Sequence, residues 1–251
     1  MAQNYAGQAF IVTGGASGIG LATVKKLLHL GATVHVVDVS NQRLELSTSP
    51  GTLWVYPGVD VSSRDAMSKT FKEIGERSPV LRGMVNCAGI VKPTPTLGGS
   101  ESDQAFKAVL DVNLMGTWNS STEFISLVAP SSTTDTQNIW RSVVNVGSLA
   151  AFKGIQHMSA YVASKHAILG LTRTWAQEWA PHRVRVNAVA PGLIKTPLVG
   201  NGAHLPEGGP LASVSGRLGE PEEVADSIMF LLSDAASYVN GQMVEVSGGL
   251  P

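Results

Sequence analysis

Residues 9–20 read AFIVTGGASGIG, an apolar run that stops abruptly at a cluster of glycines. The apolar run predicts a buried β-strand, and the helical spacing of apolar residues that follows predicts a helix over Leu21–Leu30. Three glycines between them are spaced as GxxxGxG, which lets the backbone turn tightly and lets a pyrophosphate approach closely. The start of the helix then offers free N–H groups and a positive dipole end to phosphates. We predict that this turn binds a dinucleotide cofactor through Gly14, Ser17, Gly18, Ile19 and Gly20.

A glycine-rich turn can also serve only to pack a helix against a strand, and the sequence leaves that alternative open. The context of strand, turn and helix favours phosphate binding over packing alone.

Strands and helices alternate along the rest of the chain. With the run at Ala9–Thr13, seven strands are predicted: Ala9–Thr13, Thr33–Val39, Thr52–Val61, Gly83–Cys87, Arg141–Gly147, Arg183–Ala190 and Gln242–Val246. Further helices are predicted over Arg64–Glu76, Asp103–Leu127, Ser159–Ala180 and Glu220–Leu232. Alternation at this spacing implies right-handed crossovers and a parallel sheet with helices on both faces. We therefore predict an α/β fold, with one doubly wound domain over residues 1–251.

Asp38 stands at the end of the second predicted strand, where a dinucleotide's adenosine ribose is usually recognised. A carboxylate accepts hydrogen bonds from both ribose hydroxyls and repels a 2′-phosphate. No Arg or Lys occupies Ser17, Val39 or Ser40, and we discount Arg43 as a phosphate ligand. The sequence therefore favours NAD over NADP as the cofactor, although Asp38 is also compatible with a plain solvated carboxylate.

Tyr161 and Lys165 are four residues apart at the start of a predicted helix, so their side chains share one face. A nearby ammonium favours the phenolate and is expected to lower the pKa of Tyr161, which makes the tyrosine a candidate acid/base. Ser148 ends the fifth predicted strand and is positioned to hold a substrate oxygen. The alternatives are a solvated helix face for the Tyr–Lys pair and a capping role for the serine.

The composition narrows the classes of function. Among 251 residues, 18 are basic and 19 acidic, so the net charge is −1, and no run of like charge predicts a nucleic-acid or membrane partner. The chain has one cysteine, Cys87, which fits a reducing compartment. The first residues, MAQNYAGQAFIVTGG, lack the pattern of a signal peptide, so we expect a cytoplasmic protein. We read the sequon at Asn119 as a chance match.

Several motifs occur in a fixed order: TGGASGIG at 13–20, DV at 60–61, NCAG at 86–89, Asn113 in VNLMG, Ser148, YVASK at 161–165 and PG at 191–192. Through these motifs the chain resembles the short-chain dehydrogenase/reductases, over essentially its whole length. The resemblance implies a Rossmann domain that binds NAD(P) and interconverts an alcohol and a ketone.

The resemblance also implies roles for individual residues. Asn113, Ser148, Tyr161 and Lys165 would form a catalytic tetrad, in which Asn113 bends its helix and holds a water linked to Lys165. Lys165 would also hydrogen-bond the nicotinamide ribose. The remaining cofactor contacts would come from Asp60 and Val61 beside the adenine, Asn86, Ala88 and Gly89 beneath the adenosine, and Pro191, Gly192, Ile194 and Thr196 around the nicotinamide. The family's usual second Asn after the fourth strand is Cys87 here, which we expect to be a structural thiol and not a nucleophile.

The substrate pocket is expected to be mainly apolar, which favours a hydrophobic secondary alcohol or ketone. Its predicted apolar wall comprises Val91, Pro93, Leu149, Phe152, Ile155, Met158, Leu193, Leu198 and Leu205. Ser148, Ala150 and Tyr161 complete the predicted substrate contacts. His157 is a further candidate, although we favour a surface position for it. The loop at about 192–219 is the predicted substrate-binding loop and lid.

Three other functions remain open from the sequence. They are an NADPH-dependent ketoreductase of secondary metabolism, a dinucleotide sensor, and a non-redox isomerase or cyclase on the same fold. Metal binding is not predicted.

We further expect a homotetramer, or a dimer, in which the two long predicted helices pack against their counterparts. An outward stripe on the second helix is consistent with that assembly: Ala167, Leu171, Trp175 and Trp179. The alternative is that these residues face the chain's own core.

Overall fold

The computed structural model describes residues 4–42, 44, 46, 49–78, 80–92, 102–129, 139–200 and 213–249. Within these residues the strands are β1 (Ala9–Thr13), β2 (Thr33–Val37), β3 (Thr52–Tyr56), β4 (Leu81–Asn86), β5 (Arg141–Val146), β6 (Val184–Pro191) and β7 (Met243–Val246). They form one parallel sheet in the order β3-β2-β1-β4-β5-β6-β7. The predicted seven-stranded, doubly wound Rossmann fold is confirmed.

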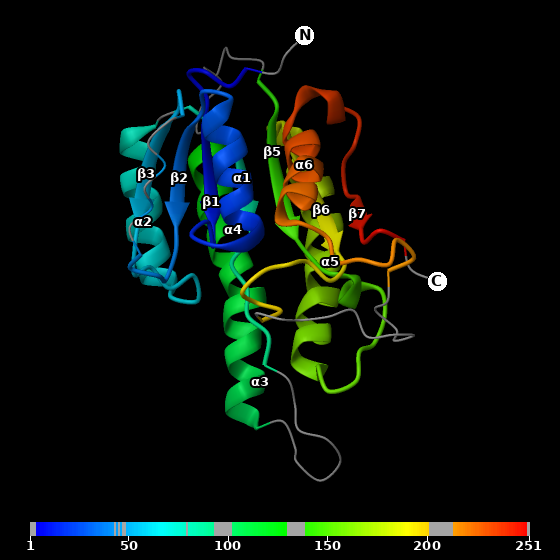
Figure 1. Cartoon of the computed structure of the whole chain (residues 1–251). Helices are drawn as coiled ribbons and strands as arrows, with labels where there is room; N and C mark the ends of the chain where they lie inside the picture. The colour runs from blue at the N-terminus through cyan, green and yellow to red at the C-terminus, as the bar shows by residue number, and fades with distance from the viewer. Residues whose placement is uncertain are drawn as a thin grey trace.

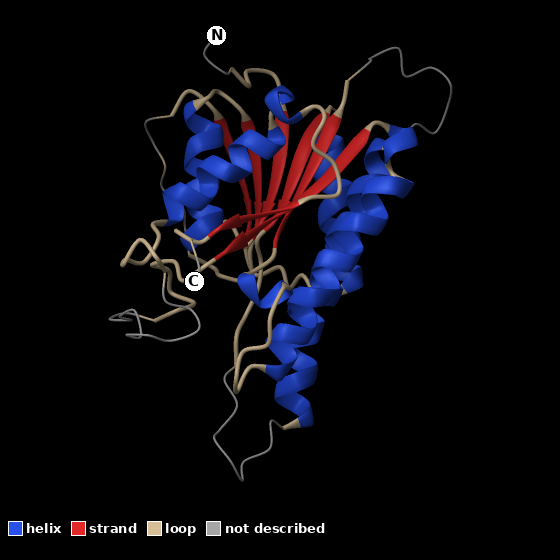
Figure 2. Ribbon diagram, turned by 90° about the vertical axis from the view of Figure 1, so that its right-hand side faces the viewer, coloured by secondary structure: helices blue, strands red, loops and turns tan. Residues whose placement is uncertain are grey.

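The helices cover both faces of the sheet (Figures 1 and 2). They are α1 (Gly18–His29), α2 (Arg64–Arg77), α3 (Asp103–Leu110), α4 (Gly116–Val128), α5 (Ser159–Glu178) and α6 (Pro221–Leu232). A π-helical turn lies at Asp111–Met115, and 3-10 turns lie at Leu149–Ala151, Ala180–His182 and Asp234–Ala236. Helices α1 and α6 contribute to one core cluster, while α2, α4 and α5 contribute to the other.

Strand β1 shows why the apolar run at the start of the chain is buried on both sides. Phe10 and Val12 point into the core beneath α1 and α6, whereas Ile11 points into the core beneath α2, α4 and α5. All three are fully buried. A continuous apolar strand is therefore required here, because alternate side chains project to opposite faces and both faces are covered.

Two predicted elements differ most from the structure in extent, and the bounds of several others differ by up to three residues. The long helix predicted over Asp103–Leu127 is divided into α3 and α4 by the π turn, where the N–H of Gly116 bonds the carbonyl of Asp111. The strand predicted over Thr52–Val61 ends at Tyr56, because Pro57 has no N–H for the ladder and Gly58 turns with a φ of 68°.

The predicted outward stripe on α5 is wrong for its two tryptophans. Trp175 and Trp179 are 3% and 7% exposed and belong to the chain's own core. Their rings stack with centroids 4.8 Å apart, and Trp118 of α4 lies 5.9 Å from Trp175. The two tryptophans are drawn inward because α4 packs beside α5 and offers an aromatic partner, so they give no support to an oligomer.

The strand order reverses beside β1, which lies between β2 and β4. The chain leaves β1 through α1 on one face of the sheet and leaves β4 through α3 and α4 on the opposite face. Ligands of such sheets bind at the carboxyl ends of the strands at this reversal. Helix α3 projects beyond those carboxyl ends (Figure 1). Among the described residues, no helix combines the length and the apolar character needed to cross a bilayer.

Candidate active site

A cavity of about 560 Å³ opens at the carboxyl ends of the strands. Asp38 follows β2, whereas Ser148 follows β5, so the cavity runs across the two strands between them, β1 and β4. Most of the predicted site residues line it: Gly14, Ser17, Gly18, Ile19, Asp38, Asp60, Val61, Ala88, Gly89, Ser148, Leu149, Met158, Tyr161, Lys165, Pro191, Gly192, Leu193, Ile194, Thr196 and Leu198.

The glycine-rich turn combines left-handed backbone with close packing. Gly14 has a φ of 65°, and a Cβ there would lie 2.7 Å from the backbone of Ala88. A Cβ on Gly20 would lie 2.1 Å from the carbonyl oxygen of Gly14, and Gly20 does not line the cavity. The packing role that the sequence left open therefore holds for these two glycines.

The first turn of α1 points its N-terminus at the cavity. Ser17 is the N-cap residue, but its side chain makes no capping hydrogen bond, and the first turn contains no acidic residue. The leading N–H groups of a helix have no partners within the helix. This N-terminus therefore keeps its positive end for an anionic group, as a pyrophosphate site requires.

Asp38 joins the glycine-rich turn to the end of β2. One carboxylate oxygen accepts a hydrogen bond from the backbone N–H of Ala16, and the other accepts one from the N–H of Ser40, both at 2.9 Å. Each carboxylate oxygen has a further lone pair, and Asp38 is one of the residues that line the cavity. These two hydrogen bonds fix the orientation of the Asp38 side chain and also restrain the glycine-rich turn at Ala16.

Tyr161, Lys165 and Ser148 meet at the same part of the cavity. The Lys165 Nζ atom lies 5.5 Å from the centroid of the Tyr161 ring and donates to the carbonyl of Val146 at 2.8 Å. Ser148 caps the turn after β5 by accepting from the N–H of Ala150 at 3.1 Å. Its side chain also acts to lower the pKa of Tyr161. The serine therefore combines the capping and site positions that the sequence left as alternatives.

The predicted lowering of the Tyr161 pKa is wrong for the chain by itself. Burial raises the pKa of Tyr161, and the interaction with Ser148 opposes that rise. Burial also lowers the pKa of Lys165 to about 8. The desolvation that both side chains experience outweighs their mutual attraction, since the lysine ammonium is directed at the Val146 carbonyl. At neutral pH Tyr161 is consequently a phenol that can give a proton.

Asn113 lies in the π turn and is almost fully buried. Its amide nitrogen donates to the carbonyl of Ile90 at 3.0 Å and to the hydroxyl of Ser164 at 3.1 Å. Its amide oxygen accepts from the N–H of Ile90 at 2.8 Å. Asn113 does not line the cavity. Its side chain instead ties the segment after β4 to helix α5.

The water relay implied for Asn113 stays a prediction. The side-chain amide is occupied by the bonds just described, and the backbone carbonyl already accepts the Thr117 hydroxyl at 2.8 Å. A water would have to bind through the second lone pair of that carbonyl.

Asn86 does not lie beneath the cavity as the resemblance implied. Its side chain is buried behind the sheet, where its nitrogen donates to Ser121 and Asn145, both at 2.8 Å. Its oxygen accepts from Ser120 at 2.6 Å. Side chains of a strand alternate between faces, and this one points toward α4, so the amide bonds polar groups of that helix.

Three predicted substrate contacts lie elsewhere. Ala150 is fully buried beneath the site and Phe152 is 43% exposed, and neither lines the cavity. His157 is exposed, has a φ of 64° and also lies outside the lining, as its favoured surface position requires. Val91 and Ile155 do line the cavity. Pro93 and Leu205, like Arg43 and residues 201–212 of the predicted lid, lie outside the described residues.

Several lining residues were not predicted from the sequence. They are Val37, Val39, Val59, Cys87, Ile90, Val112, Val146 and Gly147, whereas Pro197 and Val199 belong to the predicted substrate-binding loop. Most of them are direct neighbours of motif residues at the carboxyl ends of the strands. Their position at those strand ends is the sequence feature from which they could have been predicted. Cys87 is partly exposed, and burial among its neighbours raises the pKa of its thiol to about 12. At neutral pH this thiol is therefore protonated.

Comparison with known proteins finds close relatives along nearly the whole chain. A family model described as enoyl-(acyl carrier protein) reductase matches residues 14–251. The chain is 37% identical to the 3-oxoacyl-[acyl-carrier-protein] reductase FabG of Thermotoga maritima, over 97% of this chain and 98% of that protein. It is 34% identical to the levodione reductase of Leifsonia aquatica, over 95% and 92% of the two chains. It is also 34% identical to a 2,5-dichloro-2,5-cyclohexadiene-1,4-diol dehydrogenase of Sphingobium indicum, over 97% and 96%.

Solved structures agree with these relationships. The crystal structure of levodione reductase superposes with a TM-score of 0.85 at 33% identity and covers 98% of both chains. A short-chain dehydrogenase/reductase of Brucella melitensis superposes with a TM-score of 0.86 at 29% identity, over 99% and 98% of the two chains.

Proposed function

Because the chain belongs to the short-chain dehydrogenase/reductase family, we propose that it is an NAD(H)-dependent enzyme that interconverts a hydrophobic secondary alcohol and its ketone. Membership establishes an oxidoreductase that acts on CH–OH groups of small molecules with a nicotinamide cofactor. One observation carries the finer proposal: Tyr161, Ser148 and Lys165 line the same cavity as Asp38.

The residues of the cavity fit a dinucleotide. The uncapped N-terminus of α1 suits the diphosphate, and Asp38 keeps free lone pairs for ribose hydroxyls. The same carboxylate repels a 2′-phosphate, which supports NAD over NADP. Lys165 lines the cavity beside the end of β5 and would hydrogen-bond the hydroxyls of the second ribose. When bound, the nicotinamide supplies or accepts the hydride.

Three residues of the chain bind the substrate oxygen and transfer its proton. Ser148 donates a hydrogen bond that holds the oxygen against Tyr161. Tyr161 gives its proton to the oxygen of a ketone during reduction, and takes it back from an alcohol during oxidation. Lys165 stabilises the phenolate that remains after reduction, because its ammonium lies near the ring.

The substrate end of the cavity is mainly apolar, and this supports a hydrophobic substrate. Its lining includes Val91, Leu149, Ile155, Met158, Leu193, Leu198 and Val199. Two relatives are named for reactions of levodione and of a cyclohexadienediol, which supports a ring compound as the substrate class. The loop at 192–219 is the proposed substrate-binding loop of a single domain spanning 1–251.

A ketoreductase is the second candidate function. The raised pKa of Tyr161 keeps the phenol protonated at neutral pH, which suits the reductive direction. The relative from Thermotoga maritima is itself named a reductase. A cytoplasmic location and a homotetramer remain predictions.

The test is a screen of hydrophobic alcohols in which reduction of NAD⁺ and of NADP⁺ is followed by absorbance. We expect turnover with NAD⁺, and a strong preference for NADP⁺ would replace the proposal with the NADPH-dependent ketoreductase. Transfer of deuterium from labelled NADH into the product separates redox chemistry from an isomerase, cyclase or sensor, none of which transfers the label.

A further inference from the structure

We propose that Asn119 of α4 is a positioning residue for the adenine subsite, acting through the backbone of Val61 and Ser62. The inference rests on the proposed binding of a dinucleotide in the cavity. It assigns a role to a residue that does not itself line that cavity.

The adenine wall of the cavity is the short segment after β3. Asp60 and Val61 both line the cavity. Part of the segment is held by its own contacts: the Asp60 carboxylate accepts from the N–H and the hydroxyl of Ser62, at 2.9 and 2.7 Å. Val59 donates its N–H to the carbonyl of Asp38 at 2.9 Å, which ties the start of the segment to β2. These bonds fix the conformation of the segment and its attachment to the end of β2. They do not fix the distance between the segment and α4, which must be set by other contacts.

Asn119 sets that distance. Its side-chain nitrogen donates to the carbonyls of Val61 and Ser62 at 3.0 and 3.1 Å, so both amide hydrogens are used. The residue is 2% exposed. This burial also leaves its amide no access for a glycan, which fits the reading of its sequon as chance. Two bonds from one planar amide to consecutive carbonyls hold the wall in one register against the helix.

Gly116 lies one turn before Asn119 and permits the close approach. A Cβ at Gly116 would lie 2.5 Å from the Cγ2 of Val61, closer than side-chain atoms can come. The side-chain amide of Asn119 therefore holds the backbone of Val61 and Ser62 close to α4. The absence of a side chain at Gly116 permits this close approach. Both residues act on Val61, which is one of the residues that line the cavity.

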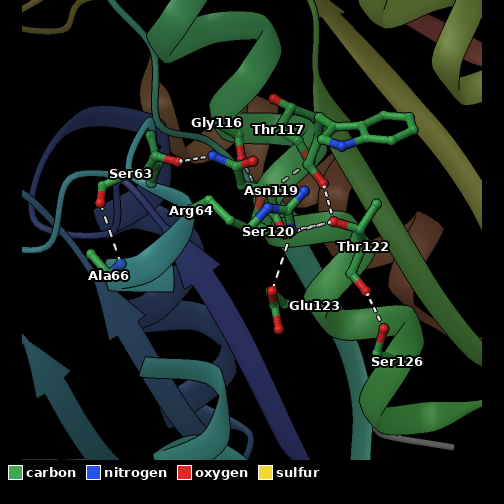
Figure 3. Close-up of polar contacts among 12 residues, drawn as sticks. Ser63, Arg64, Ala66, Gly116, Thr117, Asn119, Ser120, Thr122, Glu123 and Ser126 are labelled. Atoms are coloured by element: carbon green, nitrogen blue, oxygen red, sulfur yellow. Dashed lines mark hydrogen bonds and ion pairs between the residues drawn. The ribbon is translucent and has the colours of Figure 1, made fainter. Parts of the chain in front are cut away.

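Glu123, one turn further along α4, provides a matched control. It pairs with Arg64 of α2 at 3.2 Å on the solvent side, and Arg64 also donates to Thr122 at 2.7 Å (Figure 3). This ion pair is partly exposed and makes no bond to the adenine wall, so its loss should matter little.

The experiment measures which half of the cofactor loses affinity. The full chain and its Asn119→Asp, Asn119→Ala, Gly116→Ala and Glu123→Gln variants are titrated with NADH, AMP and reduced nicotinamide mononucleotide, with circular dichroism and thermal melting as checks of folding. We expect NADH and AMP to bind about tenfold more weakly to the Asn119 variants, because two buried carbonyls lose their donor and the wall shifts. Reduced nicotinamide mononucleotide should bind all variants alike, and Glu123→Gln should match the wild type. Gly116→Ala should likewise weaken the binding of NADH and AMP but not of reduced nicotinamide mononucleotide, because its Cβ would push Val61 away from α4.

Two outcomes overturn the inference while leaving the proposed function intact. One is unchanged AMP affinity in both Asn119→Ala and Gly116→Ala, and the other is an equal loss for AMP and nicotinamide mononucleotide. If the Asn119 variants do not fold, the Gly116→Ala and Glu123→Gln pair decides the matter by the same comparison. A wild-type chain that binds neither NADH nor AMP removes the proposed function and the inference together.

Discussion

The side-chain nitrogen of Asn113 donates a hydrogen bond to the hydroxyl of Ser164 across 3.1 Å. The hydroxyl of Ser164 donates a hydrogen bond to the backbone carbonyl of Tyr161 at 2.7 Å, and Ser164 is fully buried. The π turn between α3 and α4 is thereby linked to the turn of α5 that carries Tyr161 and Lys165. The π turn therefore helps to orient Tyr161, the proposed acid/base.

Removing the Ser164 hydroxyl should slow turnover more than it weakens cofactor binding. In Ser164→Ala, Asn113 loses an acceptor and the first turn of α5 loses a restraint, so we expect kcat to fall by about tenfold with the alcohol found by screening. NADH affinity should stay within about twofold, because Ser164 does not line the cavity. Ser164→Thr keeps a hydroxyl and should recover most of the activity. Wild-type kcat in Ser164→Ala would contradict this role.

Replacing the phenol of Tyr161 should remove the chemistry and leave the site. Tyr161→Phe keeps the ring but has no proton to exchange, so alcohol oxidation should fall by about a thousandfold or more, while NADH titration should give nearly the wild-type affinity. Turnover comparable with the wild type would refute the assignment of the acid/base.

The pH dependence of oxidation should follow the raised pKa of Tyr161. Oxidation needs the phenolate, and burial keeps the phenol protonated at neutral pH, so kcat/KM for the alcohol should rise from about pH 7 toward about pH 10. Ketone reduction uses the protonated phenol and should not rise over the same interval. Initial rates in both directions measure this, and an oxidation rate that is flat with pH would argue for a different base.

Asp38 should affect both the fold of the glycine-rich turn and the choice of cofactor. Asp38→Ala removes the acceptor of the Ala16 and Ser40 N–H groups, so we expect a loss of about 1–3 kcal/mol in the free energy of unfolding. It also removes the charge that repels a 2′-phosphate, so the ratio of NADP⁺ to NAD⁺ affinity should rise. Asp38→Asn retains one acceptor and should destabilise less. Urea denaturation and cofactor titration test the two effects separately, and an unchanged stability would show that the turn does not depend on this carboxylate.

Stability should fall in mild acid because of His35 on β2. Its ring is fully buried between the Tyr56 hydroxyl at 3.1 Å and the Ser78 hydroxyl at 2.8 Å. Burial, aided by the charge of Arg77, lowers the pKa of His35 from 6.5 to about 4. Between these two pH values the unfolded chain binds a proton at His35 and the folded chain does not. The contribution of His35 to the free energy of unfolding is therefore fully present above pH 6.5 and is lost as the pH falls toward 4.

The contribution of His35 should be about 2 kcal/mol between about pH 7 and about pH 5, measured by urea denaturation. In His35→Phe the fall in the free energy of unfolding from about pH 7 to about pH 5 should be smaller, because the titrating group is gone. The variant should also be less stable than the wild type at neutral pH. A fall identical to that of the wild type would assign the acid sensitivity to other groups.

The sequence by itself determined the features that depend on near neighbours in the chain. The apolar strand, the glycines and the helix of residues 9–29 follow from local backbone preferences and from the two-residue and 3.6-residue periods. The common face of Tyr161 and Lys165 follows from a spacing of four on a helix. The seven parallel strands follow from their alternation with helices, because crossovers permit little else.

Only the tertiary structure decided what each side chain meets. Trp175 and Trp179 turn inward because α4 lies beside them, and Asn86 points to α4 because of its place on a central strand. The pKa of Tyr161 rises because segments distant in the chain exclude water from it, which spacing from Lys165 does not reveal. Burial and hydrogen-bond partners are set by residues far apart in sequence, so neither can be read from a local pattern.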